Sequence, residues 1–513
     1  MAHLAGFGLE NFRVFKKNTW FDFAPITILT GTNNSGKSSV NKALLLLDEN
    51  LNRSEICNLE FDQGEHELLD FQSSISSKNE IIIDEHNSGQ NGALRFSLSD
   101  GFYVVDYKFL PLDKLLQDYE EDIDGNIIQE ELYTRDNEQA RPDSIHLSII
   151  KNGKKISLYN IIFEREINKQ INSNELNYGL FTLRFNIKNI ISSFSEGDTI
   201  RTNINTHVKF DDEIIDFFSG SFECGDEEVI DLGGTINLNI LCHDVENWYI
   251  KNKEPKFQKF YFDFLKPLMN EIKFVSNKNF IKCPTLKNKS HRLIEDLDMI
   301  QILKNHKRIE RVRDYQVEEV NEFTEKWLSL FTDGKFTKIN FSRINGIGSQ
   351  IKIFDKQNNT FLDLIDIGAG TTNITKIVLF LSQFFCADLF NYENKTVIIE
   401  EPETNLHPAL QSKLAHLFLD ATITFNIQFI IETHSEYLIR RLQFLTAKKE
   451  IKPEDTIIHY LFHPESEHTQ KTGEQLHTIR IQEDGRLDKE FGTGFFDEST
   501  KLMMSILTGE NLN

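Results

Sequence analysis

The sequence predicts an α/β protein, with a mixed sheet that carries helices on both faces and is split by a long insertion. A glycine-rich loop at 28–39 follows an apolar run and precedes an apolar segment. Apolar strand-like runs alternate with helical patterns between 374 and 445, which indicates a parallel sheet buried on both faces. Between these parts the chain is polar, and short strand-like runs alternate with turns. These three observations place the insertion between two halves of one sheet domain.

Composition argues against several classes of protein. The chain has 513 residues and a net charge of −23, so its surface as a whole would repel the nucleic-acid backbone, although a local basic face stays open. Its five cysteines form no C-x-x-C pair, which argues against a disulfide framework and a zinc module. No signal-peptide pattern and no membrane span is evident. We therefore expect a cytoplasmic protein without membrane contact.

Changes in composition and in the pattern of apolar residues along the chain predict four segments. We expect the N-terminal part of the sheet domain at 1–50, a β-rich insertion at 51–245, a helical and locally basic segment at 246–335, and the C-terminal part of the sheet domain at 336–513. In the first segment we expect β structure at 4–15, 20–23 and 26–30, then a helix at 36–47. In the second we expect strands at 80–84, 93–98, 102–109, 155–164, 180–191 and 200–210, with an acidic loop or loose insertion at 120–139.

The third segment contains two predicted helices and the most basic part of the chain. The helices are expected at 257–269 and 317–331. Lysines and arginines concentrate between them, over 273–313. This stretch is either a phosphate-contacting face for nucleic acid or a solvated helix face that pairs with the many acidic side chains, and we keep both interpretations.

The fourth segment reads as alternating strands and helices. We expect strands at 336–341, 351–354, 361–365, 396–399, 427–431, 456–462 and 476–481, and helices at 374–389, 408–419 and 435–445.

The loop near the N-terminus has the pattern G-x-x-x-x-G-K-S after a strand and before a helix, which is the P-loop pattern in its expected context. Its main-chain N–H groups and the start of the next helix favour phosphate. Lys37 would reach the β- and γ-phosphates, and the Ser38 hydroxyl would bind Mg²⁺. The predicted nucleotide-binding residues are Gly31, Thr32, Asn33, Asn34, Ser35, Gly36, Lys37, Ser38 and Ser39.

Two later strand ends carry groups that suit phosphate chemistry. Glu400 and Glu401 follow the apolar run 396–399, and open α/β sheets bind ligands at that edge. Glu400 is the predicted second metal ligand for Mg²⁺, and Glu401 would orient or deprotonate the attacking water. His434 follows the next buried strand, where a neutral imidazole would sense the γ-phosphate or hold water. Each of these groups could instead be an ordinary solvated or structural residue.

A glycine turn opens the helix predicted at 374–389. Gly368, Gly370 and Thr371 lie in this turn, and they offer main-chain donors and a hydroxyl to a phosphate. An ordinary helix start is the alternative interpretation of this local pattern.

These motifs, in this order, resemble the head domain of ABC-class ATPases of the SMC/RecF/OLD kind. The sequence is more similar to single-chain bacterial ATPases with a long insertion after the P-loop, such as subunits of the Septu and retron-associated anti-phage systems. The match lies in EEPE at 400–403 with LHP at 406–408, ETHSE at 432–436 and GFFDE at 494–498. Two features depart from the family pattern: G-A-G-T-T replaces a Ser-Gly-Gly core, and Glu400 stands where many relatives place Asp.

The resemblance implies a head-to-tail dimer. ATP bound at the P-loop of one copy would be completed by the helix start at 368–373 of another, and the loop at 405–407 would communicate between the two sites. It also implies a cycle that regulates a separate effector, expected to be a nuclease, because this chain shows no nuclease motif of its own. The alternatives are an ATP-dependent scaffold with little turnover, and a DNA-repair or chromosome-maintenance ATPase that binds DNA through 273–313.

Overall fold

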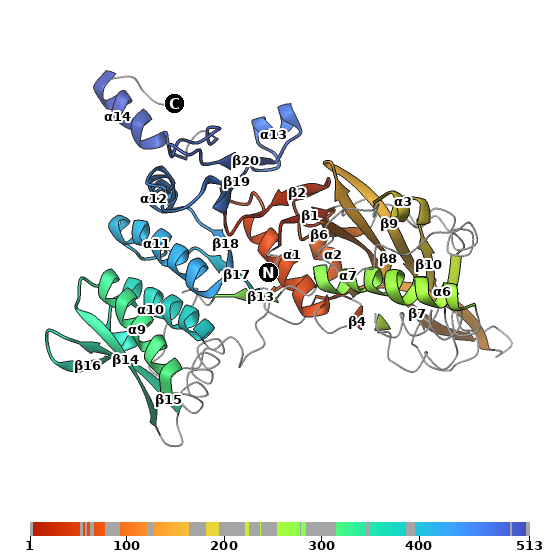
Figure 1. Cartoon of the computed structure of the whole chain (residues 1–513), viewed down its shortest axis with the longest axis horizontal. Coiled ribbons are helices and arrows are strands. Elements are labelled where there is room, and N and C mark those ends of the chain that lie inside the picture. The colour runs from red at the N-terminus through yellow and green to blue at the C-terminus, as the bar shows by residue number, and fades with distance from the viewer. Residues whose placement is uncertain are drawn as a thin grey trace. The chain divides into compact units, whose positions relative to one another are not determined.

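The chain folds into two compact units, which we describe separately. The computed structural model (Figure 1) describes residues 4–51, 55–56, 59–61, 66–76, 93–121, 127–163, 181–193, 221–224, 236–237, 254–276, 279–283, 314–344, 348–385, 395–492 and 495–508. The first unit combines Phe23–Ser38 with Asn279–Asn513, and the second combines Ala2–Asp22 with Ser39–Lys278. The four segment boundaries expected from the sequence stay a prediction.

The first unit is built on a six-stranded sheet with the strand order β13-β17-β18-β3-β19-β20. Its strands are β3 (Ile26–Gly31), β13 (Asn279–Lys282), β17 (Lys395–Glu400), β18 (Gln428–Glu432), β19 (Thr456–Leu461) and β20 (Leu476–Arg480). All neighbours pair in parallel except β19 and β20, which are antiparallel. Every residue of the four central strands is buried. Such burial requires cover on both faces, and it explains their continuous apolar sequences.

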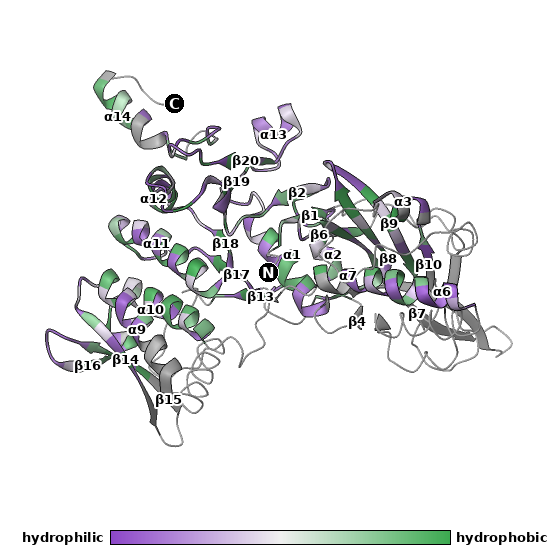
Figure 2. Cartoon of the chain, viewed as in Figure 1, coloured by the Kyte–Doolittle hydropathy of each residue, from purple (hydrophilic) through white to green (hydrophobic). Residues whose placement is uncertain are grey.

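Four long helices share one hydrophobic core with this sheet. They are α9 (Asp314–Phe331), α10 (Ala369–Ser382), α11 (Pro408–Phe425) and α12 (Glu436–Ala447). Figure 2 shows hydrophobic and hydrophilic residues alternating along α11, as expected for a helix with one face on a core. A small antiparallel sheet of β14 (Phe336–Ile344), β15 (Gly348–Asp355) and β16 (Thr360–Asp363) follows α9.

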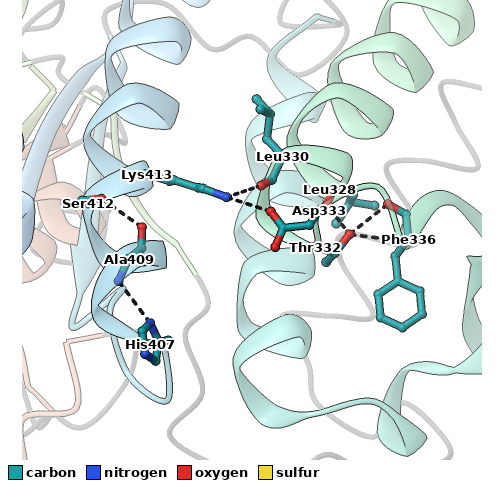
Figure 3. Close-up of polar contacts among 9 residues, drawn as sticks. All are labelled: Leu328, Leu330, Thr332, Asp333, Phe336, His407, Ala409, Ser412 and Lys413. Carbon is teal, nitrogen blue, oxygen red and sulfur yellow. Dashed lines mark hydrogen bonds and ion pairs between the residues drawn. The ribbon is translucent and has the colours of Figure 1, made fainter.

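Polar contacts fasten α9 to α11. The Lys413 ammonium donates to the Leu330 carbonyl at 2.6 Å and lies 3.3 Å from the Asp333 carboxylate, so it binds the C-terminal end of α9 (Figure 3). Farther along the pair, the Trp327 indole N–H donates to the Asp420 carboxylate at 2.8 Å. A cation at a helix C-terminus is favourable because the last carbonyls are otherwise unpaired.

Two further helices belong to the C-terminal end of the first unit. The short α13 (Glu467–Thr472) connects β19 to β20, and α14 (Glu498–Thr508) follows β20. Neither was predicted from the sequence. No helix among the described residues is long and apolar enough to cross a membrane.

The second unit is built on an antiparallel sheet with the order β11-β10-β9-β8-β7-β6-β1-β2, and β5 pairs with β8. Its strands are β1 (Gly6–Glu10), β2 (Thr19–Asp22), β5 (Leu59–Glu60), β6 (Leu94–Ser99), β7 (Tyr103–Glu121), β8 (Ile127–Lys151), β9 (Lys154–Phe163), β10 (Phe181–Phe185) and β11 (Ser221–Cys224). A separate pair joins β4 (Glu55–Ile56) to β12 (Ile236–Asn237). Helical segments are α1 (Lys37–Leu51), which begins in the first unit, α2 (Phe71–Ser74), α3 (Ile187–Ser193), α6 (Pro255–Phe260), a π-helical turn (Tyr261–Leu265) and α7 (Lys266–Ser276).

Most predicted elements are confirmed, and two expectations are wrong. The described residues 120–121 and 127–139 of the segment expected as a loop belong to β7 and β8, which pair with each other, Glu120 with Ile128 and Leu115 with Tyr133 among the pairs. Strand pairing satisfies the main chain whatever the charge of the side chains, so acidic composition was a poor guide. The strand expected at 180–191 ends at Phe185, and a helix follows. The expectations at 80–84 and 200–210, and most of the basic stretch at 273–313, lie outside the described residues.

Candidate functional site

The P-loop adopts a conformation that its glycines make possible. β3 ends at Gly31 and α1 begins at Lys37. Gly31, Asn34 and Gly36 have φ angles of 134°, 58° and 106°, a region that side chains with a Cβ rarely enter. A Cβ on Gly31 would also lie 2.1 Å from the Leu461 carbonyl oxygen. The loop therefore turns tightly into a helix N-terminus, which is an anion-binding arrangement.

Lys37 lies over its own loop. Its ammonium donates to the main-chain oxygens of Gly31 at 3.2 Å and Thr32 at 2.8 Å, and the residue is only 5% exposed. Burial lowers the pKa of Lys37, and the carboxylates of Glu432 and Glu401 act in the opposite direction. The lysine is thus a buried charge beside the loop, with acidic side chains near it.

Two carboxylates lie side by side at the carboxyl ends of β17 and β18. Glu400 and Glu432 are register partners in neighbouring parallel strands, so their side chains leave the same face of the sheet. Both are almost fully buried, at 4% and 5% exposure. The Ser38 hydroxyl donates to Glu432 Oε1 at 2.9 Å. The structure therefore joins the P-loop serine to the sheet edge through Glu432.

The carboxyl of Glu432 is strongly perturbed. Burial raises its pKa to about 7; Glu400 and Glu401 act in the same direction, whereas the Ser38 hydrogen bond and Lys37 oppose the change. Sequence analysis gave Glu432 no role. A signal was available, because Glu432 ends a buried strand in the same way as Glu400.

Glu401 is the residue at which the chain leaves β17. Its φ of 47° turns the chain sharply, and its N–H donates to the Glu432 main-chain oxygen at 2.8 Å. Its carboxylate accepts a long hydrogen bond from the Thr404 hydroxyl, at 3.5 Å. The side chain is exposed, and its charge influences both Lys37 and His434. Glu401 is thus a solvent-accessible carboxylate beside the buried pair.

His434 lies in the turn after β18, and a second acidic residue holds that turn. The His434 N–H donates to Glu403 Oε1 at 2.6 Å. Partial burial lowers the pKa of His434, Lys37 lowers it further, and Glu401 opposes the change, so the imidazole is neutral near pH 7. Burial also raises the pKa of Glu403, whose Oε2 is buried without a hydrogen-bond partner. Sequence analysis did not give Glu403 a role.

Residues 368–371, expected as a glycine turn before the helix, are instead the N-cap and first turn of α10, and they pack against the loop that follows Glu401. Gly368 is the N-cap of α10, and a Cβ on Gly370 would lie 2.5 Å from the Asn405 main-chain oxygen. Within α10, the Asn373 amide donates to the Pro402 oxygen at 3.1 Å. In the part of the chain that the structure describes, no hydrogen bond or ion pair joins 368–371 to the P-loop. The structure thus brings this turn to the 402–406 loop.

Comparisons with known proteins give the family. Residues 4–439 match the model of the AAA ATPase domain, which spans most of the chain. The chain belongs to the AAA ATPase domain family. Residues 451–506 of this chain match a second model, described as a protein of unknown function (DUF3696). A comparison with curated proteins gives no match.

Solved structures of SMC heads are similar to this chain over almost its whole length. The Smc head domain of Pyrococcus furiosus with an extended coiled coil, bound to the C-terminal domain of ScpA, has 12% identity, a TM-score of 0.36 and coverage of 99% of this chain and 100% of that one. The SMC head domain of Thermotoga maritima has 10% identity, a TM-score of 0.33 and coverage of 94% and 99%.

The donor groups at the P-loop fit a nucleotide with a hard cation. Among the described residues, no group of three or more His, Cys, Asp or Glu side chains could hold a metal ion. Mg²⁺ does not need one, because it takes one or two protein oxygens together with phosphate oxygens and water. The Ser38 hydroxyl with Glu400 or Glu432 supplies such oxygens. The buried Ser35 hydroxyl has no hydrogen-bond partner, which leaves one more polar group inside the loop for a phosphate.

Proposed function

We propose that this chain hydrolyses ATP at a site shared by two copies, and that the cycle regulates a partner effector. The observation that carries the proposal is the meeting of four groups at one sheet edge: the P-loop, the Glu400–Glu432 pair, Glu401 and His434. Phosphoryl transfer to water needs positioning and charge stabilisation more than covalent chemistry, and these groups are suited to both.

Each group has a distinct part in the proposal. The loop N–H groups and Lys37 bind the β- and γ-phosphates, and Lys37 exchanges its contacts with loop carbonyls for phosphate oxygens. Bound Mg²⁺ would neutralise charge on those phosphates. Ser38 and Glu400 hold the cation. Glu401, accessible to solvent, orients and deprotonates the attacking water. His434, neutral because of its lowered pKa, accepts or donates one hydrogen bond near the γ-phosphate.

In the proposal, the second copy contributes residues 368–371 to the nucleotide site. This turn packs on Asn405 of the same chain and presents the N-terminus of α10, where main-chain N–H groups are unpaired by the helix. Residues Gly368, Gly370 and Thr371 of one copy would face the phosphate of the other. His407 is the N-cap of α11, and its Nδ1 accepts from the Ala409 N–H at 3.3 Å (Figure 3).

The effector and the pathway rest on the sequence resemblance alone. A separate nuclease, controlled by the ATPase cycle in bacterial anti-phage defence in the cytoplasm, is the finer form of the proposal. Direct contact with nucleic acid through 273–313 is a further part of it.

A single substitution separates an enzyme from an ATP-dependent scaffold. Glu401→Gln keeps the size of the side chain but removes the base, so phosphate release should fall by at least about 100-fold, while ATP binding stays within about twofold of wild type. Glu436→Gln is the matched control, because Glu436 lies on α12 and pairs with Arg440 at 3.2 Å. Wild-type protein that binds ATP without any turnover, with or without partner and nucleic acid, would favour the scaffold.

A further inference from the structure

The hairpin after α12 supports the P-loop from the C-terminal part of the chain. β19 runs parallel to β3, with Leu461 opposite Gly31. The Thr32 N–H donates to the Leu461 oxygen at 3.2 Å, and Gly31 lies so close to that oxygen that no Cβ fits. Residues 451–506, which match a family of unknown function, therefore contact the first two residues of the loop.

A second contact reaches the middle of the loop. The Gln475 side-chain amide donates to the Ser35 main-chain oxygen at 2.8 Å. Ser35 lies between Asn34 and Gly36, both with positive φ. In a trans peptide the C=O and the following N–H point in opposite directions. By holding the Ser35 C=O, Gln475 therefore fixes the direction of the Gly36 N–H, one of the expected phosphate donors.

Gln475 is itself held in place by the hairpin. Its main-chain oxygen accepts from the Phe462 N–H at 2.9 Å, so its backbone belongs to the ladder between β19 and β20. The helix before it, α13, ends at Gly473 in the left-handed conformation. The His468 ring of α13 stacks on Phe462 with ring centroids 3.9 Å apart. These contacts hold the turn that carries Gln475 in a fixed position.

We propose that Gln475 is a positioning residue for nucleotide binding, and that the segment 451–506 has a role in holding the P-loop in its phosphate-binding shape. The proposal rests on ATP binding at this loop, as proposed above. Gln475 acts through the Ser35–Gly36 peptide and does not touch the reacting atoms. It pre-organises N–H donors that any nucleoside diphosphate or triphosphate would use, so it affects the binding of ATP and ADP alike.

Two substitutions of Gln475 test this. Gln475→Met keeps the length of the side chain but has no donor, and Gln475→Ala removes the side chain. Loss of one such hydrogen bond should weaken binding of fluorescent ATP and ADP analogues by about 3- to 10-fold. Because the interaction is equal in the ground and transition states, the turnover at saturating ATP should stay within about twofold while KM rises. The unfolding temperature without nucleotide should change little.

Gln470→Ala is the matched control, because the Gln470 amide donates to the Glu465 oxygen at 3.1 Å on the same connection. Its nucleotide affinity should equal that of wild type. Wild-type affinity in Gln475→Met would overturn the inference, and so would an equal loss in Gln470→Ala. If the wild type binds no ATP, the proposed function fails together with the inference, whereas binding that is unaffected at Gln475 refutes the inference alone.

Discussion

Glu432→Gln should remove a pH-dependent loss of stability that the buried carboxyl imposes on the first unit. Glu432 is 5% exposed, and burial raises its pKa from about 4.5 to about 7. Between these pH values the folded chain keeps a proton that the unfolded chain has lost. The native state therefore becomes less stable as pH rises through this window, and the whole loss is present above pH 7. Glutamine is neutral at every pH and still accepts from Ser38.

The displacement of this pKa sets the size of the effect. A rise of the Glu432 pKa from 4.5 to about 7 lowers the free energy of unfolding by on the order of 3 kcal/mol between pH 4.5 and pH 8, because one unit of pKa is worth about 1.4 kcal/mol. Glu432→Gln should therefore gain stability relative to wild type by up to that amount when the pH is raised from 5 to 8. Glu271 also has a pKa of about 7, but its effect is common to both proteins and cancels in the difference.

Urea unfolding at pH 5 and pH 8, followed by circular dichroism with EDTA and without nucleotide, measures this difference. Glu436→Gln is the control and should show the wild-type pH dependence. Parallel pH profiles for Glu432→Gln and wild type would refute the reasoning, as would a variant that is less stable than wild type at pH 8 by more than at pH 5.

Two further predictions concern packing in the first unit. Gly370→Ala should lower the free energy of unfolding in urea by about 1–3 kcal/mol, because its Cβ would lie 2.5 Å from the Asn405 oxygen. Gly368→Ala is the control: a Cβ there meets nothing within 4 Å, so it should lower that free energy by less than about 1 kcal/mol. Equal losses in the two variants would contradict this prediction. Trp327→Phe should cost about 1–3 kcal/mol by the same assay, because it removes the N–H bonded to Asp420; an unchanged urea midpoint would show that this hydrogen bond adds nothing.

Local patterns were sufficient to predict most strands and long helices of the first unit, but not α13 and α14. The runs at 396–399 and 427–431 are fully buried strands in the structure, because a parallel sheet with two covered faces needs continuous apolar sequence. The order of the strands could not be predicted: β18 lies between β17 and β3, a long-range arrangement that no local pattern encodes. The same is true of the β7–β8 hairpin, whose pairing overrides an acidic composition.

The candidate site was predicted where a residue type and its strand-end position agree. Glu400, Glu401 and His434 were found in this way, and their catalytic and metal-binding roles stay predictions. Glu432 was overlooked although it ends a buried strand as Glu400 does. Glu403 and Gln475 were missed because their importance lies in contacts across the chain, to the His434 N–H and to the Ser35 oxygen. Such contacts join residues up to 440 positions apart, and only the folded structure shows them.

The central claim is ATP hydrolysis at this sheet edge by two copies of the chain. The most direct measurement is phosphate release at saturating ATP and Mg²⁺, over a range of protein concentrations, for wild type and Glu401→Gln. We expect the activity per wild-type chain to rise with concentration to a plateau as dimers form, and Glu401→Gln to stay near background throughout. Activity per chain that does not change with concentration, or that survives Glu401→Gln, would contradict it.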